Sequence, residues 1–153
     1  MVTKELEEIN GKIVLDLGGG TSLYRRGEQY ICLDLDKNKL GKDGILANAT
    51  NIPLADNCID LILCIAVTHH LTNPELELMV QESHRVLKET GKFILIDAVR
   101  TNRLLSKMMW KYDRGSYPRT YAEIISTIGQ RFNVVRIKRF KRLHEYILLE
   151  NTR

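Results

Sequence analysis

The sequence predicts an α/β fold, a doubly wound and mostly parallel sheet of about seven strands that ends in an antiparallel C-terminal hairpin. Short runs rich in Val, Ile and Leu alternate with segments of helical spacing, which is typical of parallel strands joined by crossover helices. The last two apolar runs are separated by too few residues for a crossover helix, so they are expected to pair antiparallel. With 153 residues, the chain is expected to form one domain over residues 1–153.

Local composition places the helices and strands of this fold. The clearest helix is expected at 74–88, where apolar residues follow helical spacing. Pro74 suits its first turn, Asn73 suits its cap, and Gly91 ends the helical pattern. The other expected helices are 102–112, and 120–128 stopped by Gly129; the expected strands are 12–17, 29–34, 44–47, 59–65, 91–97, 132–140 and 143–150.

Composition argues against a membrane-spanning or secreted protein. The chain is 44% hydrophobic and 27% charged, as is ordinary for a globular domain. The longest apolar run, 59–67, is about half the length that a membrane span needs, and Asp60 interrupts it. The polar N-terminus does not resemble a signal peptide, so we expect a cytoplasmic protein. The three cysteines include no C-x-x-C pair and are expected to be reduced thiols, namely Cys32, Cys58 and Cys64.

Positive charge is concentrated in the C-terminal third of the chain. The net charge is +4. Residues 100–119 contain six Arg or Lys against the single acid Asp113, and residues 131–144 contain six more with no acid. These two segments are where an anionic partner is expected to bind.

A glycine triplet, 18–20, follows the first expected strand. Such a turn lets a ligand approach the backbone closely. A dinucleotide fingerprint would need glycine at the position of Leu23, and a P-loop would need Gly-Lys-Ser/Thr, which the sequence lacks. The remaining interpretation is a nucleoside-type cofactor that lies across the loop without a pyrophosphate.

An acidic residue at the end of the second expected strand supports that interpretation. Asp34 occupies the place from which a carboxylate accepts hydrogen bonds from both hydroxyls of a ribose. Asp36, two residues on, is instead expected to cap a short helix that begins at Lys37.

Five segments, in chain order, match a known set of motifs. Residues 14–21 form a glycine-rich first motif, and Leu33-Asp34-Leu35 carries an acid after the second strand. Residues 48–54 are similar to "D-A-x-x-L-P-F", 59–71 to "F-D-x-V…L-H-H-L", and 82–93 to "E-x-x-R-V-L-K-P-G-G". Over about residues 12–98 the chain thus resembles the class I S-adenosylmethionine-dependent methyltransferases, especially small members of methyltransferase type 11. The resemblance implies a Rossmann-like fold, S-adenosylmethionine as cofactor and S-adenosylhomocysteine as product.

The resemblance also implies a role for individual residues. Asp34 would bind the ribose diol, with Leu35 beside it in the same motif. Ile65 would line the cofactor near its sulfonium, and Tyr24 would lie over the cofactor side of the sheet. The amino-acid end would contact Asp16 and the backbone of Gly18, Gly19 and Gly20, and the adenine edge would contact Asn48 and the Ala49 backbone amide.

The chain departs from the family pattern at four places. Ser22 replaces the last loop glycine, and only residues 23–29 remain for the following helix, which is about one turn. Asn48 replaces the commoner aspartate, so it would pair with the adenine amino group through its side-chain carbonyl without charge. Thr90 replaces the usual proline.

Methyl transfer chiefly requires that acceptor, methyl group and sulfur be aligned, and it needs a general base only where the acceptor must lose a proton. The candidate bases are His69, His70 and His144. The first two follow the fourth expected strand, at the edge where α/β sheets bind ligands. A packing role in that loop competes with catalysis; if one of them acts, His69 is favoured. His84, on the long helix, is expected to be structural.

No motif identifies the methyl acceptor. The sequence contains neither the N-P-P-Y motif of base-amino methylation nor a Pro-Cys pair. Segment 98–120 takes the place of a substrate lid, and part of it is basic and amphipathic, so it either packs on the sheet or contacts a membrane surface or lipid-like acceptor. We therefore expect a small or lipid-linked acceptor, with anionic character. The amphipathic part consists of Leu104, Leu105, Met108, Met109 and Trp110 with Arg103, Lys107 and Lys111.

Two other functions stay open on the sequence. One is a non-catalytic S-adenosylmethionine-binding module or regulatory subunit, because only about ten residues precede Gly11, where many related enzymes have substrate-capping helices. The other is an RNA-directed methyltransferase or RNA-binding protein that uses segment 131–144. That segment has few aromatic residues and no recognised RNA-binding motif, which makes nucleic acid the less favoured partner.

Overall fold

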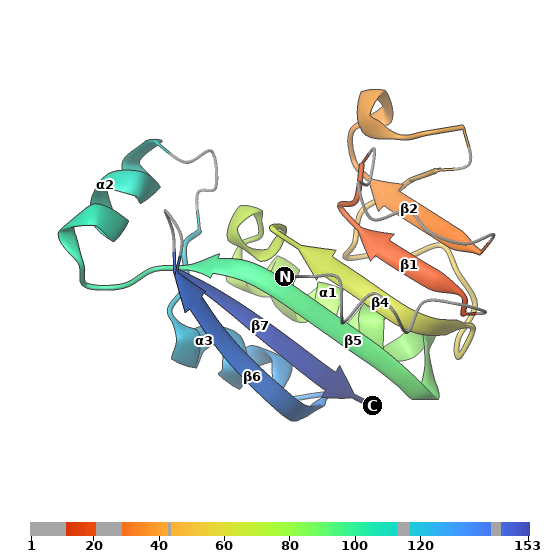
Figure 1. Ribbon diagram of the computed structural model, residues 1–153. Helices are drawn as coiled ribbons and strands as arrows, with labels where there is room; N and C mark the ends of the chain where they lie inside the picture. Colours follow the sequence, from red (N-terminus) through yellow and green to blue (C-terminus); the bar gives the residue numbers. More distant parts are fainter. Residues whose placement is uncertain (1–11, 21–28, 43, 113–116, 142–144) are drawn as a thin grey trace.

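Seven strands form one sheet in the described part of the chain (Figure 1). The computed structural model describes residues 12–20, 29–42, 44–112, 117–141 and 145–153. The strand order across the sheet is β3-β2-β1-β4-β5-β7-β6. The strands are β1 (Val14–Leu17), β2 (Tyr30–Asp34), β3 (Ile45–Leu46), β4 (Ile59–Ile65), β5 (Leu87–Val99), β6 (Asn133–Lys141) and β7 (Glu145–Thr152).

The sheet is parallel except at its C-terminal hairpin. β1 pairs in parallel with both β2 and β4, β2 pairs with β3, and β4 pairs with β5. β7 pairs antiparallel with β5 on one side and with β6 on the other. The predicted fold class, a mostly parallel Rossmann-like sheet with an antiparallel C-terminal hairpin, is confirmed. Because β2 and β4 flank β1, the winding reverses at β1, and open α/β sheets bind ligands beyond the carboxyl ends of the strands at such a point.

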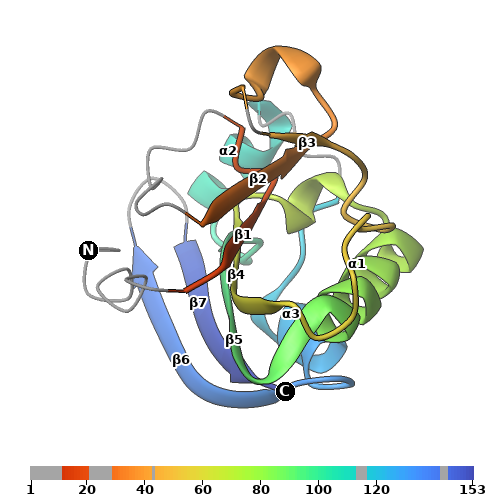
Figure 2. The same ribbon diagram turned by 90° about the vertical axis from the view of Figure 1, so that its right-hand side faces the viewer.

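Two helices cover one face of the sheet. α1 (Asn73–Val86) and α3 (Tyr121–Ile128) contact each other on that face (Figure 2). Together with the sheet they enclose the larger core, in which Leu15, Phe93 and Ile128 are fully buried. The opposite face carries a smaller apolar cluster, formed by Val14, Tyr30, Cys32, Leu61, Leu63, Ile94 and Ile96.

The long helix differs from its predicted bounds at both ends. The sequence predicted 74–88 with Asn73 as cap, but α1 begins at Asn73 and its cap is Thr72. Thr72 Oγ1 accepts the backbone N–H of Glu75 at 3.4 Å, and the Glu75 carboxylate accepts the backbone N–H of Thr72 at 2.8 Å. This reciprocal capping box satisfies two backbone donors, and it starts the helix one residue earlier.

β5 begins at Leu87, four residues before the predicted start of that strand at Gly91. Leu87 pairs with Ile59 of β4, and the register shifts between Ile59 and Leu61. The Leu87 side chain is fully buried, so joining the sheet removes it from water. The helix therefore ends at Val86, and Gly91 lies inside a strand rather than at a helix end.

Two other caps were predicted from the sequence. Gly129 caps the C-terminal end of α3, as predicted, whereas Thr120, predicted as the first residue of that helix, is its N-cap and forms a capping box with Glu123. Asp36 caps the short helix η2 (Lys37–Lys39), where its carboxylate accepts the Asn38 backbone N–H at 3.0 Å. The remaining helices are α2 (Leu104–Tyr112), which follows β5, and the one-turn helix η3 (Thr68–His70), which follows β4.

All three cysteines are free thiols. Cys32 and Cys64 are buried in strands, and Cys58 is partly exposed. Burial raises the pKa of the Cys64 thiol, and the nearby Asp97 and Asp16 raise it further. None of the described helices is long and apolar enough to cross a membrane.

Candidate functional site

The glycine triplet forms a tight turn at the carboxyl end of β1. Gly18 and Gly20 have φ angles of 68° and 53°, in the left-handed region that favours glycine. A side chain on Gly18 would place its Cβ 2.6 Å from a methyl carbon of Val67. The turn therefore requires glycine for its backbone conformation and for its close approach to the loop after β4.

Asp16 lies beneath this turn. Its side chain is buried, and its Oδ2 accepts the hydroxyl of Tyr30 at 2.7 Å. A Cβ on Gly19 would collide with the Asp16 carboxylate. Asp16 thus supports the glycine turn from below and does not line the cavity above it.

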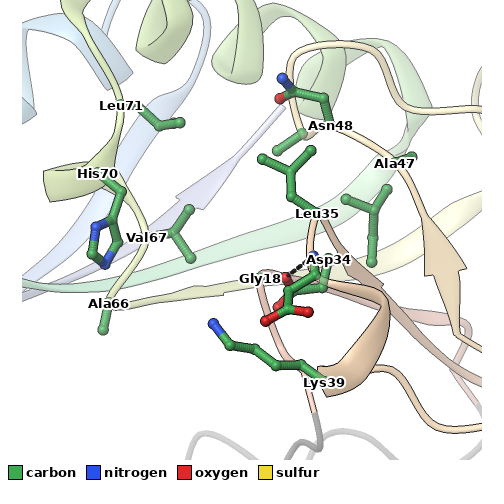
Figure 3. A pocket seen from close by; sticks show the side chains of 13 residues that line it. Gly18, Asp34, Leu35, Lys39, Ala47, Asn48, Ala66, Val67, His70 and Leu71 are labelled. Carbon is green, nitrogen blue, oxygen red and sulfur yellow. Dashed lines mark hydrogen bonds between the residues drawn. The ribbon is translucent and has the colours of Figure 1, made fainter.

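A cavity of about 370 Å³ opens at the carboxyl ends of β1, β2 and β4 (Figure 3). Figure 3 shows Asp34 and Lys39 on one side of it and His70 with Val67 on the other. It lies at the reversal of winding, where the fold binds ligands. Its lining consists of Gly18, Leu33, Asp34, Leu35, Asp36, Lys39, Ala47, Asn48, Ala49, Ala66, Val67, His70 and Leu71.

Half of the predicted cofactor residues line this cavity. Gly18, Asp34, Leu35, Asn48 and Ala49 do so. Tyr24 lies outside the described residues, as do residues 23–28 of the predicted one-turn helix after the loop. Four predicted residues are not among those that line this cavity, namely Asp16, Gly19, Gly20 and Ile65.

Asp34 is the polar group most directly engaged with the cavity. Only 9% of the residue is exposed. Its Oδ1 accepts the backbone N–H of Asp36 at 2.9 Å, and within the described part of the chain Oδ2 accepts no hydrogen bond. Because Asp34 lines the cavity, this second oxygen is an acceptor there for a ligand's hydroxyl groups.

The opposite end of the cavity combines apolar surface with an amide. Asn48 Oδ1 accepts the backbone N–H of Thr50 at 3.0 Å, which orients the side chain and leaves the second lone pair of this oxygen for a ligand. Leu35 is 66% exposed at the cavity wall. This pairing of an apolar wall with a polar edge suits a flat heteroaromatic ring.

The loop after β4 approaches the cavity through Ala66 and Val67 rather than through the predicted Ile65. Side chains alternate along a strand, and Ile65 packs against the smaller apolar cluster on the opposite face. Ala66 follows with a φ of 57°, a conformation that residues other than glycine rarely adopt. Its backbone N–H donates to the Ile96 carbonyl at 2.8 Å, which keeps the chain beside β5.

A buried carboxylate on β5 holds the next two residues of this loop. Asp97 Oδ2 accepts both the backbone N–H and the hydroxyl of Thr68, each at 2.6 Å. Its Oδ1 lies 2.6 Å from Nδ1 of His69. Because an ionised carboxylate only accepts hydrogen bonds, Nδ1–H is the donor and Nε2 is the imidazole atom that can exchange a proton.

The rings of His70, His69 and Trp110 contact one another in sequence. The centroids of the two histidine rings are 4.2 Å apart, and the Trp110 ring of α2 lies edge-on to His69 at 5.8 Å. His70 lines the cavity, whereas His69 is buried behind it.

The other two histidines do not line the cavity in the described part of the chain. His84 packs edge-on against Phe132. Burial lowers the pKa of His84, and the positive charges of Arg153 and Arg131 lower it further. His144 lies outside the described residues.

Arg119 and Asp97 hold the loop after β4, and sequence reasoning missed both of these supports. Arg119 was counted with the cations that face an anionic partner, but it is buried and donates to the carbonyls of Thr68 and Leu71 at 2.6 and 2.7 Å. It also donates to Asn73 Oδ1 at 2.8 Å, and burial lowers its pKa. A charge count cannot separate a solvated cation from one that holds a loop together, and no local pattern marks either residue.

Comparison with known proteins places the chain in a family. A family model described as a methyltransferase domain matches residues 15–95, which is more than half of the chain. The chain belongs to this methyltransferase family.

Two uncharacterized relatives resemble the methyltransferase domain in sequence. One, from Methanocaldococcus jannaschii, is 33% identical over 104 residues, which are 63% of this chain and 45% of that protein. The other, a methyltransferase-like protein from Schizosaccharomyces pombe, is 29% identical over 130 residues, which are 72% of this chain and 50% of that protein.

The methyltransferase domain spans about half the length of the curated relatives it matches. Its fold is that of a crystal structure described as an S-adenosylmethionine-dependent methyltransferase from Aquifex aeolicus. That structure has a TM-score of 0.74 at 21% identity, and the match covers 98% of this chain and 86% of the other. The family favours methyl transfer over a non-catalytic module or an RNA-binding protein.

S-adenosylmethionine is the cofactor of this methyltransferase domain, and S-adenosylhomocysteine is the product. The described residues fit it on two counts. Asp34 lines the cavity and has one carboxylate oxygen that accepts no hydrogen bond within the described part of the chain, as suits a ribose diol. Gly18 lines the cavity and carries no side chain, so a ligand can approach its backbone closely.

Proposed function

We propose that this protein transfers the methyl group of S-adenosylmethionine to a small or lipid-linked acceptor, with the cavity beyond β1, β2 and β4 as the cofactor site. The observation that carries the proposal is the Asp34 carboxylate, which is almost wholly buried yet keeps one oxygen for a ligand. When bound, the cofactor supplies a methyl group already activated by its sulfonium. The protein's own task is to orient the reacting groups and exclude water.

Residues on three strand ends would share the binding. Asp34 would accept the ribose hydroxyls, as the carboxylate after the second strand does in nucleoside-binding α/β folds. The Asn48 side chain and the Ala49 backbone, with Leu35 as apolar wall, would hold the adenine. The backbone of Gly18, Gly19 and Gly20 would face the amino-acid end, with Asp16 supporting that turn through its contact beneath Gly19.

His69 is the general base that we propose for an acceptor that must lose a proton. The support for this role is its contact with Asp97, since a carboxylate that accepts Nδ1–H fixes the imidazole tautomer in which Nε2 is the basic nitrogen. His70 would then form part of the cavity wall between this imidazole and the cofactor.

Calorimetric titration with S-adenosylmethionine and S-adenosylhomocysteine tests the cofactor site. Asp34→Ala is expected to weaken both affinities by about 5- to 150-fold, since a charge-assisted hydrogen-bond partner contributes about 1–3 kcal/mol. Asp56→Ala is the matched control, because Asp56 is exposed, pairs with Arg85 and does not line the cavity. Absence of binding by the unmodified protein at millimolar ligand would overturn the proposal, and equal effects of the two variants would place the ribose elsewhere.

Methylation assays on candidate acceptors test the base. His69→Asn is expected to flatten the acidic limb of the pH–rate profile for an acceptor that loses a proton, while cofactor affinity stays unchanged. His70→Asn, which alters the cavity wall, is expected to weaken cofactor affinity and keep that limb. The reverse assignment of these two effects would transfer the role to His70.

A further inference from the structure

An apolar stripe is exposed along α2. Leu104, Met108 and Tyr112 are 75%, 53% and 81% exposed. They recur every fourth residue, so with 3.6 residues per turn they lie in one row on the helix surface. Scattered exposed apolar residues are ordinary, whereas a continuous row on a short helix indicates a surface that is covered in use.

A row of cations runs beside this stripe. Arg103, Lys107 and Lys111 are exposed, and each directly precedes one member of the stripe. Residues 100–112 include no acid. An apolar row flanked by Lys and Arg is the design of an interfacial helix, which buries its apolar side at the headgroup boundary and directs its cations to the headgroups.

The other side of α2 is attached to the protein. Ser106 is buried, and its Oγ accepts the backbone N–H of Thr101 at 3.1 Å. Trp110 is four residues further on and so shares a side with Ser106; it contacts His69 edge-on. The stripe is therefore directed outward, and Figure 1 shows α2 standing away from the sheet beyond the carboxyl end of β5.

The attached side also connects α2 to the cavity. Trp110 contacts His69, His69 contacts His70, and His70 lines the cavity. A surface that docks through α2 would thus lie at the carboxyl edge of the sheet, where the cofactor cavity opens.

We propose that α2 docks this protein on an anionic membrane surface. Leu104, Met108 and Tyr112 enter the boundary between headgroups and acyl chains, and Arg103, Lys107 and Lys111 contact the anionic headgroups. Charge complementarity selects this occupant. An uncharged protein partner would bury Lys107 and Lys111 without supplying a countercharge, which is unfavourable, whereas anionic lipid attracts basic residues near its surface. Docking is independent of methyl transfer, but it fits a lipid-linked acceptor.

Co-sedimentation of the full chain with vesicles tests the docking. The protein is expected to bind vesicles of phosphatidylcholine and phosphatidylserine, to bind phosphatidylcholine alone at least about tenfold more weakly, and to lose binding as salt is raised. Lys107→Glu with Lys111→Glu, and separately Leu104→Ser with Met108→Ser, are each expected to weaken binding by about tenfold or more. The matched control is Arg131→Glu with Lys138→Glu on exposed sites near the hairpin, which makes the same change in net charge.

Three results would overturn the proposal. The first is no binding of the unmodified protein to phosphatidylserine vesicles. The second is an equal loss in the control and in the lysine variant, which would assign binding to overall charge. The third is a change of oligomeric state in the serine variant with vesicle binding intact, which would make a second copy of the chain the occupant. Emission of Trp110, the only tryptophan, and S-adenosylhomocysteine affinity verify the fold and keep this test separate from that of the proposed function.

Discussion

The imidazole Nδ1 of His69 lies 2.6 Å from Oδ1 of Asp97, a residue 28 positions further along the chain. The parallel pairing of β4 with β5 explains the contact. Ile65 at the end of β4 pairs with Ile96 of β5, so the next residue of β5 lies beside the place where the chain leaves β4. One buried carboxylate can therefore hold Thr68 and His69 together.

Asp97→Asn is expected to lower the free energy of unfolding by about 2–4 kcal/mol. An amide has one acceptor oxygen where the carboxylate has two, so at least one of the donors on Thr68 and His69 loses its partner in a buried place. Chemical denaturation measures the loss. Asp56→Asn, which removes an exposed ion pair with Arg85, should cost less than about 1 kcal/mol. Equal losses would contradict the network.

Arg119→Met is expected to loosen the loop that carries His69 and His70. The substitution removes the Arg119 donors from the carbonyls of Thr68 and Leu71. The Thr68 carbonyl still accepts the Leu71 backbone N–H at 3.1 Å, but the Leu71 carbonyl loses its side-chain donor, and a buried unsatisfied carbonyl costs about 1–3 kcal/mol. Hydrogen exchange should therefore accelerate at the backbone amides of His70 and Leu71. Arg100→Met is the control, since the Arg100 side chain is half-exposed and its ion pair with Glu123 is long, at 3.9 Å. Unchanged protection in Arg119→Met would show that the loop is held by other contacts.

Ala66→Gly is expected to preserve stability or to raise the free energy of unfolding by up to about 1 kcal/mol. The left-handed backbone at Ala66 is strained for alanine and unstrained for glycine. The same substitution at Ala98, a buried residue in the extended strand β5, should instead lower stability by about 1–2 kcal/mol. Thermal unfolding of both variants compares the signs, and a loss at position 66 as large as that at 98 would contradict the prediction.

His84 is expected to make the protein less stable as the pH falls. Burial, with Arg153 and Arg131 nearby, lowers its pKa in the folded state below the usual 6.5. The unfolded chain therefore takes up this proton at a higher pH than the folded chain does. Stability is lost as the pH falls below about 6.5, and the loss is complete once the pH is below the folded-state pKa.

Urea unfolding of the unmodified protein and of His84→Gln, at neutral pH and at about pH 5.5, measures this contribution. The variant should show a smaller difference between the two conditions. Comparison at each pH cancels the contributions of other titrating groups. A pH dependence in His84→Gln as steep as in the unmodified protein would assign it to groups other than His84.

Element boundaries show where local pattern ceased to be sufficient. The sequence predicted that the long helix continues to Lys88, because no local signal ends the helical pattern before Gly91. The end at Val86 was decided by the pairing of Leu87 with Ile59, a contact between residues distant in sequence. By contrast, the end of α3 at Gly129 depends on neighbours within one turn, and the sequence predicted it.

The sequence by itself determined the order of strands and helices, the glycine turn after β1 and the acid at the end of β2. Each depends on residues close together in the chain, through side-chain periodicity, backbone conformation at glycine or a strand's last position. Only the tertiary structure decided that Ala66 rather than Ile65 meets the cavity, that Asp97 holds His69, and that Arg119 is a buried support rather than a free cation. The physical reason is that these contacts follow from strand register and from loop packing, which join segments that no local pattern relates.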